Sequence, residues 1–145
     1  MEIALAGPGA ARLCETAAIP AQCFSSLSDV RPARWDVLAL TRGVPCPASQ
    51  ALTVHSLLLP GDMDRSAVQD VHAAQAVTYG FSPRDTLTLS SLAGHILCLQ
   101  RSLKGQGGIL LEPQEFPLPA SFAVLSAEES LLAAGLLLLT RGALT

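Results

Sequence analysis

The sequence predicts an α/β protein with a three-layer, Rossmann-like, mainly parallel sheet and an antiparallel extension. Three observations support this fold class. Apolar runs such as Ile3–Ala6 lie close to helix-like segments in the first half of the chain, which favours parallel strands. After Gly80, the residues from Thr86 to Ser90 alternate between polar and apolar, as in a strand with one buried face. Further on, the turn Lys104–Gly108 separates two apolar runs, which is typical of a hairpin.

The composition is that of one globular domain spanning residues 1–145. Half of the residues are hydrophobic and 14% are charged. This length is enough for one hydrophobic core and too short for two ordinary domains. The net charge is −3 and the basic residues form no run, so nucleic acid is not an expected partner.

No membrane segment or metal site is expected. The longest fully apolar run, Leu131–Leu139, is shorter than the roughly 20 residues that span a bilayer and is predicted to form a buried helix. The chain begins Met1-Glu2-Ile3 without the positive region of a secretory signal, which predicts a cytoplasmic protein with reduced, buried and unreactive cysteines. Their spacing contains no Cys-x-x-Cys pair and no nearby His pair, so a zinc site is not expected. We expect no other cofactor either. The cysteines are Cys14, Cys23, Cys46 and Cys98.

The first half of the chain is predicted to alternate between strands and helices. A helix is expected after the Gly7-Pro8-Gly9 turn, because apolar residues then recur at helical spacing. A second helix is expected from Met63 to Ala74 for the same reason, with Asp62 or Asp64 as its N-cap. The predicted strands are Ile3–Ala6, Cys23–Leu27, Trp35–Leu40, Leu52–Leu59 and Ala76–Tyr79.

The second half is predicted to be antiparallel, followed by the third of about three helices. Strands His95–Arg101 and Ile109–Glu112 flank the glycine-rich turn. The segment Pro113–Pro119 suits only the edge of a sheet, because proline cannot donate a hydrogen bond to a neighbouring strand. Ser126 and Glu129 form a capping box. The helix that they open is apolar almost all round, so we expect it to be buried against the sheet.

The Gly7-Pro8-Gly9 turn raises the question of a phosphate site. In dinucleotide-binding domains, a Gly-x-Gly turn between a strand and a helix brings backbone amides to a pyrophosphate. Here Arg12 occupies the third glycine position and Pro8 removes one amide, so a plain turn is the favoured interpretation. The alternative is contact between Arg12 and a phosphate or another anion.

The chain contains no catalytic motif of the common kinds. It has no Gly-x-Ser-x-Gly nucleophile elbow and no His-Glu-x-x-His metal helix. His55 lies inside a predicted strand with no histidine, cysteine or carboxylate close to it in sequence, so a structural role is favoured over that of a catalytic base. We therefore expect a protein without catalytic activity.

A group of polar residues falls on or beside adjacent strands of the second half. One interpretation is a binding surface, in which hydroxyl groups and Arg101 hold a polar ligand or the edge strand of a partner. The other is a solvated sheet face, because threonine favours strands. The hydroxyl-rich strand also predicts a possible homodimer in which two such strands pair. The candidate binding residues are Tyr79, Arg84, Asp85, Thr86, Thr88, Ser90, Ser91, Gln100, Arg101 and Glu112.

Between Leu57 and Leu139 the order of elements carries a family resemblance. The strand Val77-Thr78-Tyr79-Gly80-Phe81 ends in a Tyr-Gly step and precedes the antiparallel part, and an Ala-rich and Leu-rich helix follows from about Ser130. With Leu59-Pro60-Gly61-Asp62-Met63-Asp64 in the place of an Asn-Ala-Asp-Asp-like step, this region resembles the later part of the central domain of Mur ligases.

The resemblance implies a reduced relative of that ligase domain. The family's phosphate loop, which ends in Gly-Lys-Thr or Gly-Lys-Ser, is missing, and the single lysine, Lys104, lies in a hairpin turn. We also expect no counterpart of the family's acceptor-binding C-terminal domain. The resemblance therefore implies a non-catalytic binding or scaffold protein. The alternative is a small nucleotide or sugar-nucleotide binding protein of cell-wall metabolism, with its ligand at the carboxyl ends of the parallel strands around Gly7–Arg12 and Gly61–Asp64.

Overall fold

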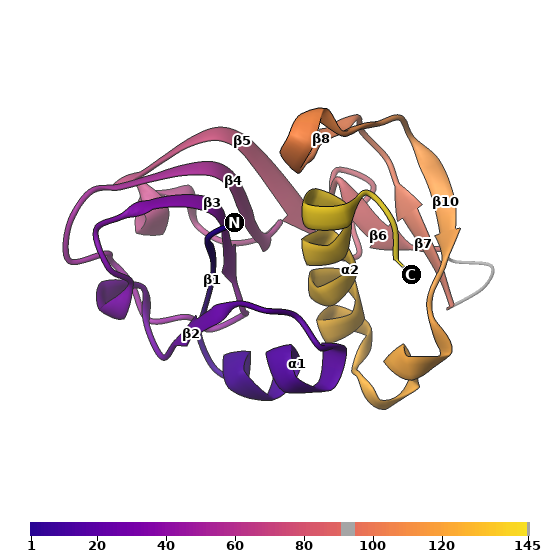
Figure 1. Ribbon diagram of the computed structural model, residues 1–145, viewed down its shortest axis with the longest axis horizontal. Helices are drawn as coiled ribbons and strands as arrows, with labels where there is room; N and C mark the ends of the chain where they lie inside the picture. Colours follow the sequence, from indigo (N-terminus) through magenta and orange to yellow (C-terminus); the bar gives the residue numbers. More distant parts are fainter. Residues whose placement is uncertain (91–94, 145) are drawn as a thin grey trace.

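An eight-stranded sheet forms the centre of the computed structural model, which describes residues 1–90 and 95–144 (Figure 1). The strand order is β10-β7-β6-β5-β4-β3-β1-β2. The fold class is therefore as predicted, with a mainly parallel sheet and an antiparallel extension. A separate small hairpin pairs β8 with β9. The strands are β1 (Ile3–Ala6), β2 (Gln22–Phe24), β3 (Arg34–Leu40), β4 (Leu52–Pro60), β5 (Val71–Tyr79), β6 (Leu87–Leu89), β7 (Ile96–Leu99), β8 (Leu103–Lys104), β9 (Leu110–Leu111) and β10 (Gln114–Pro117).

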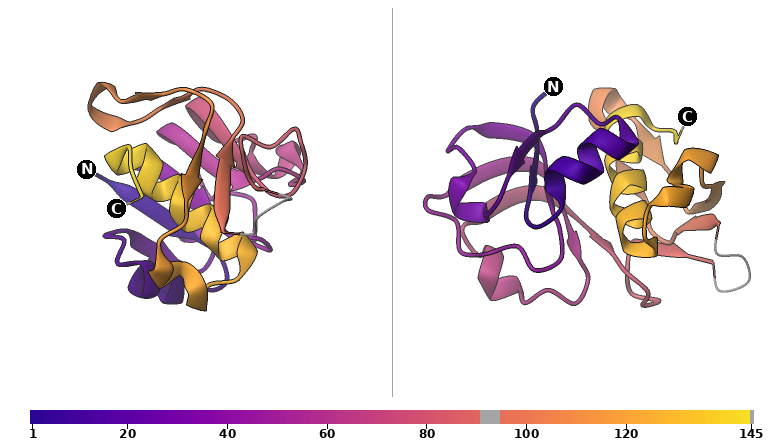
Figure 2. Two further views of the ribbon diagram at one scale, coloured as in Figure 1. Left: turned by 90° about the vertical axis from the view of Figure 1, so that its right-hand side faces the viewer. Right: turned by 90° about the horizontal axis from the view of Figure 1, so that it is seen from below.

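The two α-helices of the described residues, α1 (Ala10–Ala17) and α2 (Ala127–Arg141), cover one face of the sheet (Figures 1 and 2). Helix α2 packs over β3, β4, β5 and β6. Loops and short 3-10 turns cover the opposite face, where Trp35 and Leu38 belong to a second buried cluster. The sheet is thus covered on both sides, although only one of the covering layers is made of α-helices.

The parallel part of the sheet determines where the carboxyl ends of its strands lie. The chain passes from β1 through α1 to β2 and then returns to β3 on the other side of β1. Strands β3, β4 and β5 are parallel neighbours, so their carboxyl ends lie side by side along one edge. In open α/β sheets, ligands bind at this edge.

The hydroxyl-rich strand β6 is an interior strand. It pairs in parallel with β5 through Tyr79 and Leu87, and antiparallel with β7 through Thr88 and Cys98. The predicted edge position of this strand is wrong, because β6 lies between β5 and β7 in the sheet order. The edges of this sheet are β2 and β10. The proline-rich segment forms β10, which confirms its predicted edge position.

The helix predicted from Met63 to Ala74 is absent. In its place, a 3-10 turn, Arg65–Val68, is capped by Asp64, whose carboxylate accepts hydrogen bonds from the Ser66 amide at 3.0 Å and the Ser66 hydroxyl at 2.9 Å. Strand β5 then begins at Val71, opposite Leu52 of β4. In the long parallel ladder between β4 and β5, the backbone groups of alternate residues in this segment form hydrogen bonds to β4. These hydrogen bonds outweigh the weak preference for a helix that the spacing of the apolar residues indicates.

Helix α2 begins and packs as predicted. The Ser126 hydroxyl accepts a hydrogen bond from the Glu129 amide at 3.1 Å, and the Glu129 carboxylate accepts one from the Ser126 amide at 2.9 Å. The bond from the Ser126 amide holds the pKa of Glu129 below its usual value. From Ser130 to Leu139 the helix is buried, because its apolar surface faces the sheet and the antiparallel strands on several sides.

Candidate functional site

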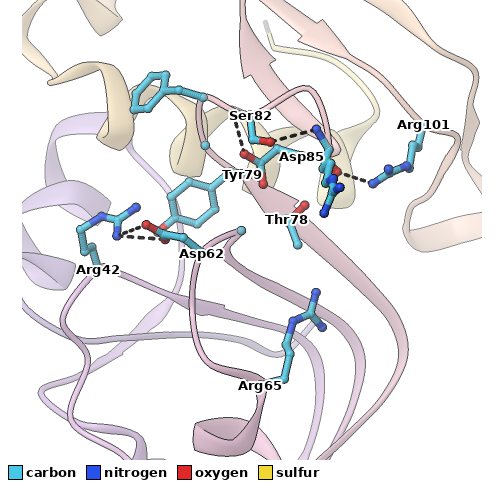
Figure 3. A pocket seen from close by; sticks show the side chains of 12 residues that line it. Arg42, Asp62, Arg65, Thr78, Tyr79, Ser82, Asp85 and Arg101 are labelled. Atoms are coloured by element: carbon cyan, nitrogen blue, oxygen red, sulfur yellow. Dashed lines mark hydrogen bonds and ion pairs between the residues drawn. The ribbon is translucent and has the colours of Figure 1, made fainter.

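A cavity of about 520 Å³ opens at the carboxyl ends of β4 and β5 (Figure 3). Its walls come from short segments that directly follow strands. Arg42 follows β3, the segment from Gly61 to Arg65 follows β4, and the segment from Gly80 to Asp85 follows β5. The lining residues are Arg42, Gly61, Asp62, Arg65, Thr78, Tyr79, Gly80, Phe81, Ser82, Arg84, Asp85 and Arg101.

Arginine side chains dominate the charge of this cavity. Arg42 is neutralised, since its guanidinium contacts Asp62 at 3.0 Å and Glu128 at 2.5 Å. Arg101 donates to the backbone carbonyl of Arg84. The guanidinium groups of Arg65 and Arg84 have no hydrogen-bond or ion-pair partner among residues 1–90 and 95–144. In Figure 3 the Arg65 side chain extends from the 3-10 turn toward Thr78. The cavity therefore has arginines available to bind an anion.

Asp85 is the buried acid of the site. The residue is only 5% exposed, and its carboxylate accepts a hydrogen bond from the Ser82 amide at 3.0 Å. Two glycines make room for the carboxylate. A Cβ atom added to Gly61 would lie 1.6 Å from Asp85 Oδ1, and one added to Gly80 would lie 2.5 Å from Oδ2. The Asp85 carboxylate thus packs between Gly61, which follows β4, and Gly80, which follows β5.

The segment between β5 and β6 is fixed by hydrogen bonds from its neighbours. Gln100 donates to the Asp85 carbonyl at 2.6 Å, and the Ser82 hydroxyl accepts from the Arg84 amide at 3.1 Å. The Thr86 amide donates to the Thr78 hydroxyl at 3.1 Å. These hydrogen bonds hold the backbone of the segment on both sides of Arg84.

Tyr79 has a structural role in the cavity wall. Its side chain is buried and its hydroxyl donates to the Leu40 carbonyl at 2.7 Å, which ties the end of β5 to the end of β3. Burial raises the pKa of Tyr79, so the hydroxyl keeps the proton that it donates.

Tyr79→Phe is expected to lower the free energy of unfolding by about 1–2 kcal/mol, because the buried Leu40 carbonyl loses a donor. Urea denaturation monitored by the fluorescence of Trp35 measures this change. An unchanged stability together with a loss of ligand affinity would show instead that the hydroxyl serves a ligand.

A smaller cavity of about 150 Å³ lies next to the first and shares Arg42 and Tyr79 with it. Pro8 and Gly9 of the glycine turn line it, together with Glu128 and Glu129 of α2. These carboxylates make it unsuitable for an anion. The Arg12 guanidinium is ion-paired with Glu129 at 2.6 Å and lines neither cavity. Anion contact by Arg12 therefore remains a prediction that this geometry does not support.

The structure brings together part of the predicted binding group. Tyr79, Arg84, Asp85 and Arg101 line the larger cavity, and Gln100 supports it. The other candidates do not line it. Thr86 is buried, Thr88 and Ser90 are half-buried in or beside β6, Glu112 accepts a hydrogen bond from the Ser102 hydroxyl, and Ser91 lies outside the described residues.

Arg42 and Arg65 line the cavity but were not among the residues predicted from the sequence. Each lies just after a strand that runs parallel to its neighbours, and this position is the signal that would have indicated them. Asp62 lay within the segment expected to hold a nucleotide, and the structure places it in the wall of the cavity.

Comparison with known proteins finds no match to any family model, curated protein or solved structure. Across the part of the chain that the structure describes, no helix has the length and apolar character needed to cross a bilayer. Within the same part, no group of three or more His, Cys, Asp or Glu side chains is arranged to hold a metal ion. The candidate site must therefore be judged from its own geometry.

Proposed function

We propose that this protein binds a small phosphate-bearing molecule in the cavity at the carboxyl ends of β4 and β5, without transforming it chemically. The observation that carries the proposal is the pair of unpartnered guanidinium groups, Arg65 and Arg84, which face one cavity in a chain of net charge −3. Arginine binds phosphate oxygens through two parallel N–H donors, and this geometry favours phosphate over a simple halide.

The dimensions of the cavity support a ligand of small-molecule size. Its volume of about 520 Å³ lies in the range of sites that hold metabolites. The lining also includes Phe81, a residue that is 62% exposed. An exposed aromatic ring beside arginines suits a ligand that carries both a phosphate and a flat or sugar-like group. A nucleotide or sugar-nucleotide is thus the favoured ligand class.

The acids of the site support binding rather than catalysis. Asp62 is ion-paired with Arg42, and the Asp85 carboxylate is buried against Gly61 and Gly80. A general base must reach the proton that it abstracts. Asp85 is buried, and the exposed Asp62 carboxylate is held in an ion pair with Arg42. We also propose a relation to the Mur ligase central domain. The Tyr79-Gly80 step at the end of β5, the antiparallel strands after it and the buried Leu-rich helix support this relation.

A thermal-shift titration tests the function. Pyrophosphate, ATP with magnesium and a uridine diphosphate sugar are each added to the purified protein, with N-acetylglucosamine and sodium chloride of equal ionic strength as controls. A ligand at a hundred times its dissociation constant stabilises the folded state by about 2.7 kcal/mol, which raises Tm by several degrees. A saturable rise is expected with at least one phosphate compound and with neither control. Equal shifts with sodium chloride, or no shift at all, would contradict binding and favour a scaffold role.

A further inference from the structure

Two of the four cysteines contact each other near β2, the edge strand on the side of the sheet opposite the antiparallel extension. Cys14 of α1 is buried, Cys23 of β2 is exposed, and their sulfur atoms lie 3.3 Å apart. The prediction that all four cysteines are buried is therefore wrong for Cys23. Cys46 and Cys98 are half-buried free thiols.

The fold holds this thiol pair in place. Helix α1 ends at Ala17, and the Ile19 amide donates to the Cys14 carbonyl at 3.0 Å, which turns the chain back toward β2. Cys23 then pairs with Leu5 of β1 in the sheet. Both cysteines thus belong to regular elements that pack against each other. A disulfide requires a sulfur separation of about 2.0 Å, so the two sulfurs must move closer together to form one.

We propose that Cys14 and Cys23 form a modification site, at which a low-molecular-weight disulfide such as oxidised glutathione reacts with Cys23 and Cys14 completes an intramolecular disulfide. The inference rests on the thiol pair and is independent of the arginine-lined cavity.

The reaction proceeds in two balanced exchange steps. The Cys23 thiolate attacks one sulfur of oxidised glutathione, so that a Cys23–glutathione disulfide forms and one glutathione leaves as a thiolate. Cys14 then loses its proton to solvent and attacks the Cys23 sulfur, and the second glutathione leaves. Two protein thiols are oxidised and one disulfide molecule is reduced to two thiols.

The surroundings of the two sulfurs determine the order of attack. Burial, and then the hydrogen bond and charge of Cys23, raise the pKa of Cys14 to about 12, so its thiolate is scarce at neutral pH. Cys23 is the exposed partner and is accessible to a dissolved disulfide. Once Cys23 is bonded to glutathione, burial still raises the pKa of Cys14, and only the smaller contributions of the Cys23 thiol are lost.

The test treats the reduced, folded protein with a glutathione redox buffer, alkylates the remaining thiols and analyses tryptic peptides by mass spectrometry. Cys14 and Cys23 stay on one peptide, residues 13–34, because no lysine or arginine separates them and Pro32 protects the bond after Arg31. Cys46 and Cys98 lie on other peptides and serve as internal controls. In the wild type, peptide 13–34 is expected to lose two hydrogen atoms and carry no alkyl group, while Cys46 and Cys98 remain alkylated.

Two variants test the order of attack. Cys14→Ser is expected to accumulate glutathione on Cys23, and Cys23→Ser is expected to leave Cys14 unmodified until the protein is denatured. Because Cys23 is exposed, the second variant keeps the test valid if the first fails to fold. The oxidised wild type should also melt roughly 5 °C higher than the reduced form. Three results would overturn the proposal. In the wild type, these are two alkylated cysteines in peptide 13–34 or glutathione retained on Cys23. In folded Cys23→Ser, it is modification of Cys14.

Discussion

Replacing Arg65 and Arg84 together with alanine is expected to weaken the binding of pyrophosphate more than a hundredfold. A hydrogen bond to a charged group contributes about 1.5–3 kcal/mol, so the removal of two such bonds exceeds the roughly 2.7 kcal/mol of a hundredfold change. The two guanidiniums have no partner in the described structure, so their removal leaves no buried acid uncompensated. The variant should therefore fold with a stability close to that of the wild type. Isothermal titration calorimetry measures the dissociation constant.

The matched control for this variant is the double substitution Arg34→Ala and Arg141→Ala. Both of these arginines are exposed and neither lines the cavity, so the control removes the same charge from another part of the surface. It is expected to change pyrophosphate affinity by less than about threefold, because charges beyond about 10 Å are screened at 0.1 M salt. A similar loss of affinity in both double variants would show that the net charge of the protein, and not the cavity, attracts the anion.

Gly61→Ala is expected to lower the free energy of unfolding by about 2–3 kcal/mol, because the new Cβ would collide with the Asp85 carboxylate. The carboxylate has little room to move. Gly80 lies against its other oxygen, and the Ser82 amide donates to it. Relief of the collision breaks that hydrogen bond or shifts the segment between β5 and β6. Urea denaturation measures the loss of stability.

A double-mutant cycle with Asp85→Ala isolates the collision from other effects of the substitution. Asp85→Ala is itself expected to be destabilising, since the Ser82 amide loses its acceptor. In that background, however, Gly61→Ala should lose most of its effect, because the atoms with which it collides are gone. Additive losses in the double variant would mean that Gly61 is required for another reason.

Those elements that local chemistry determines could be predicted from the sequence. Ser126 and Glu129 satisfy the first amides of α2 within three residues of each other, so the start of this helix depends on nothing distant. Pro117 of β10 and the prolines that flank the strand exclude an interior position whatever the remaining fold is. The mainly parallel sheet with its antiparallel extension was predictable for a similar reason, because buried apolar strands and alternating strands differ in pattern.

Other elements depend on partners that are far away in the sequence. The segment from Val71 to Ala74 is a strand because β4 lies beside it, and its local spacing of apolar residues favours a helix. The interior position of β6 depends on β7, which pairs with its second side. The register and the neighbours of a strand cannot be predicted from the sequence of that strand alone.

Only some of the residues of the candidate site could be predicted from the sequence. Arg84, Asp85 and Arg101 were identified from a cluster of polar residues in one part of the chain, and they do line the cavity. Arg42 and Arg65 come from two other strand ends, and only the sheet order places them beside the first group. The hydroxyl side chains misled the prediction, because Thr86 is buried beside β6.

The central claim is that an anion binds at the carboxyl ends of β4 and β5. The most direct test is an NMR titration of the isotopically labelled protein with pyrophosphate, followed through its backbone amides and arginine side chains. The largest saturable shifts are expected at Gly61, Arg65, Ser82 and Arg84, with little change around Arg12 of α1. Shifts that are largest around Arg12, or spread evenly over the surface without saturation, would contradict the site.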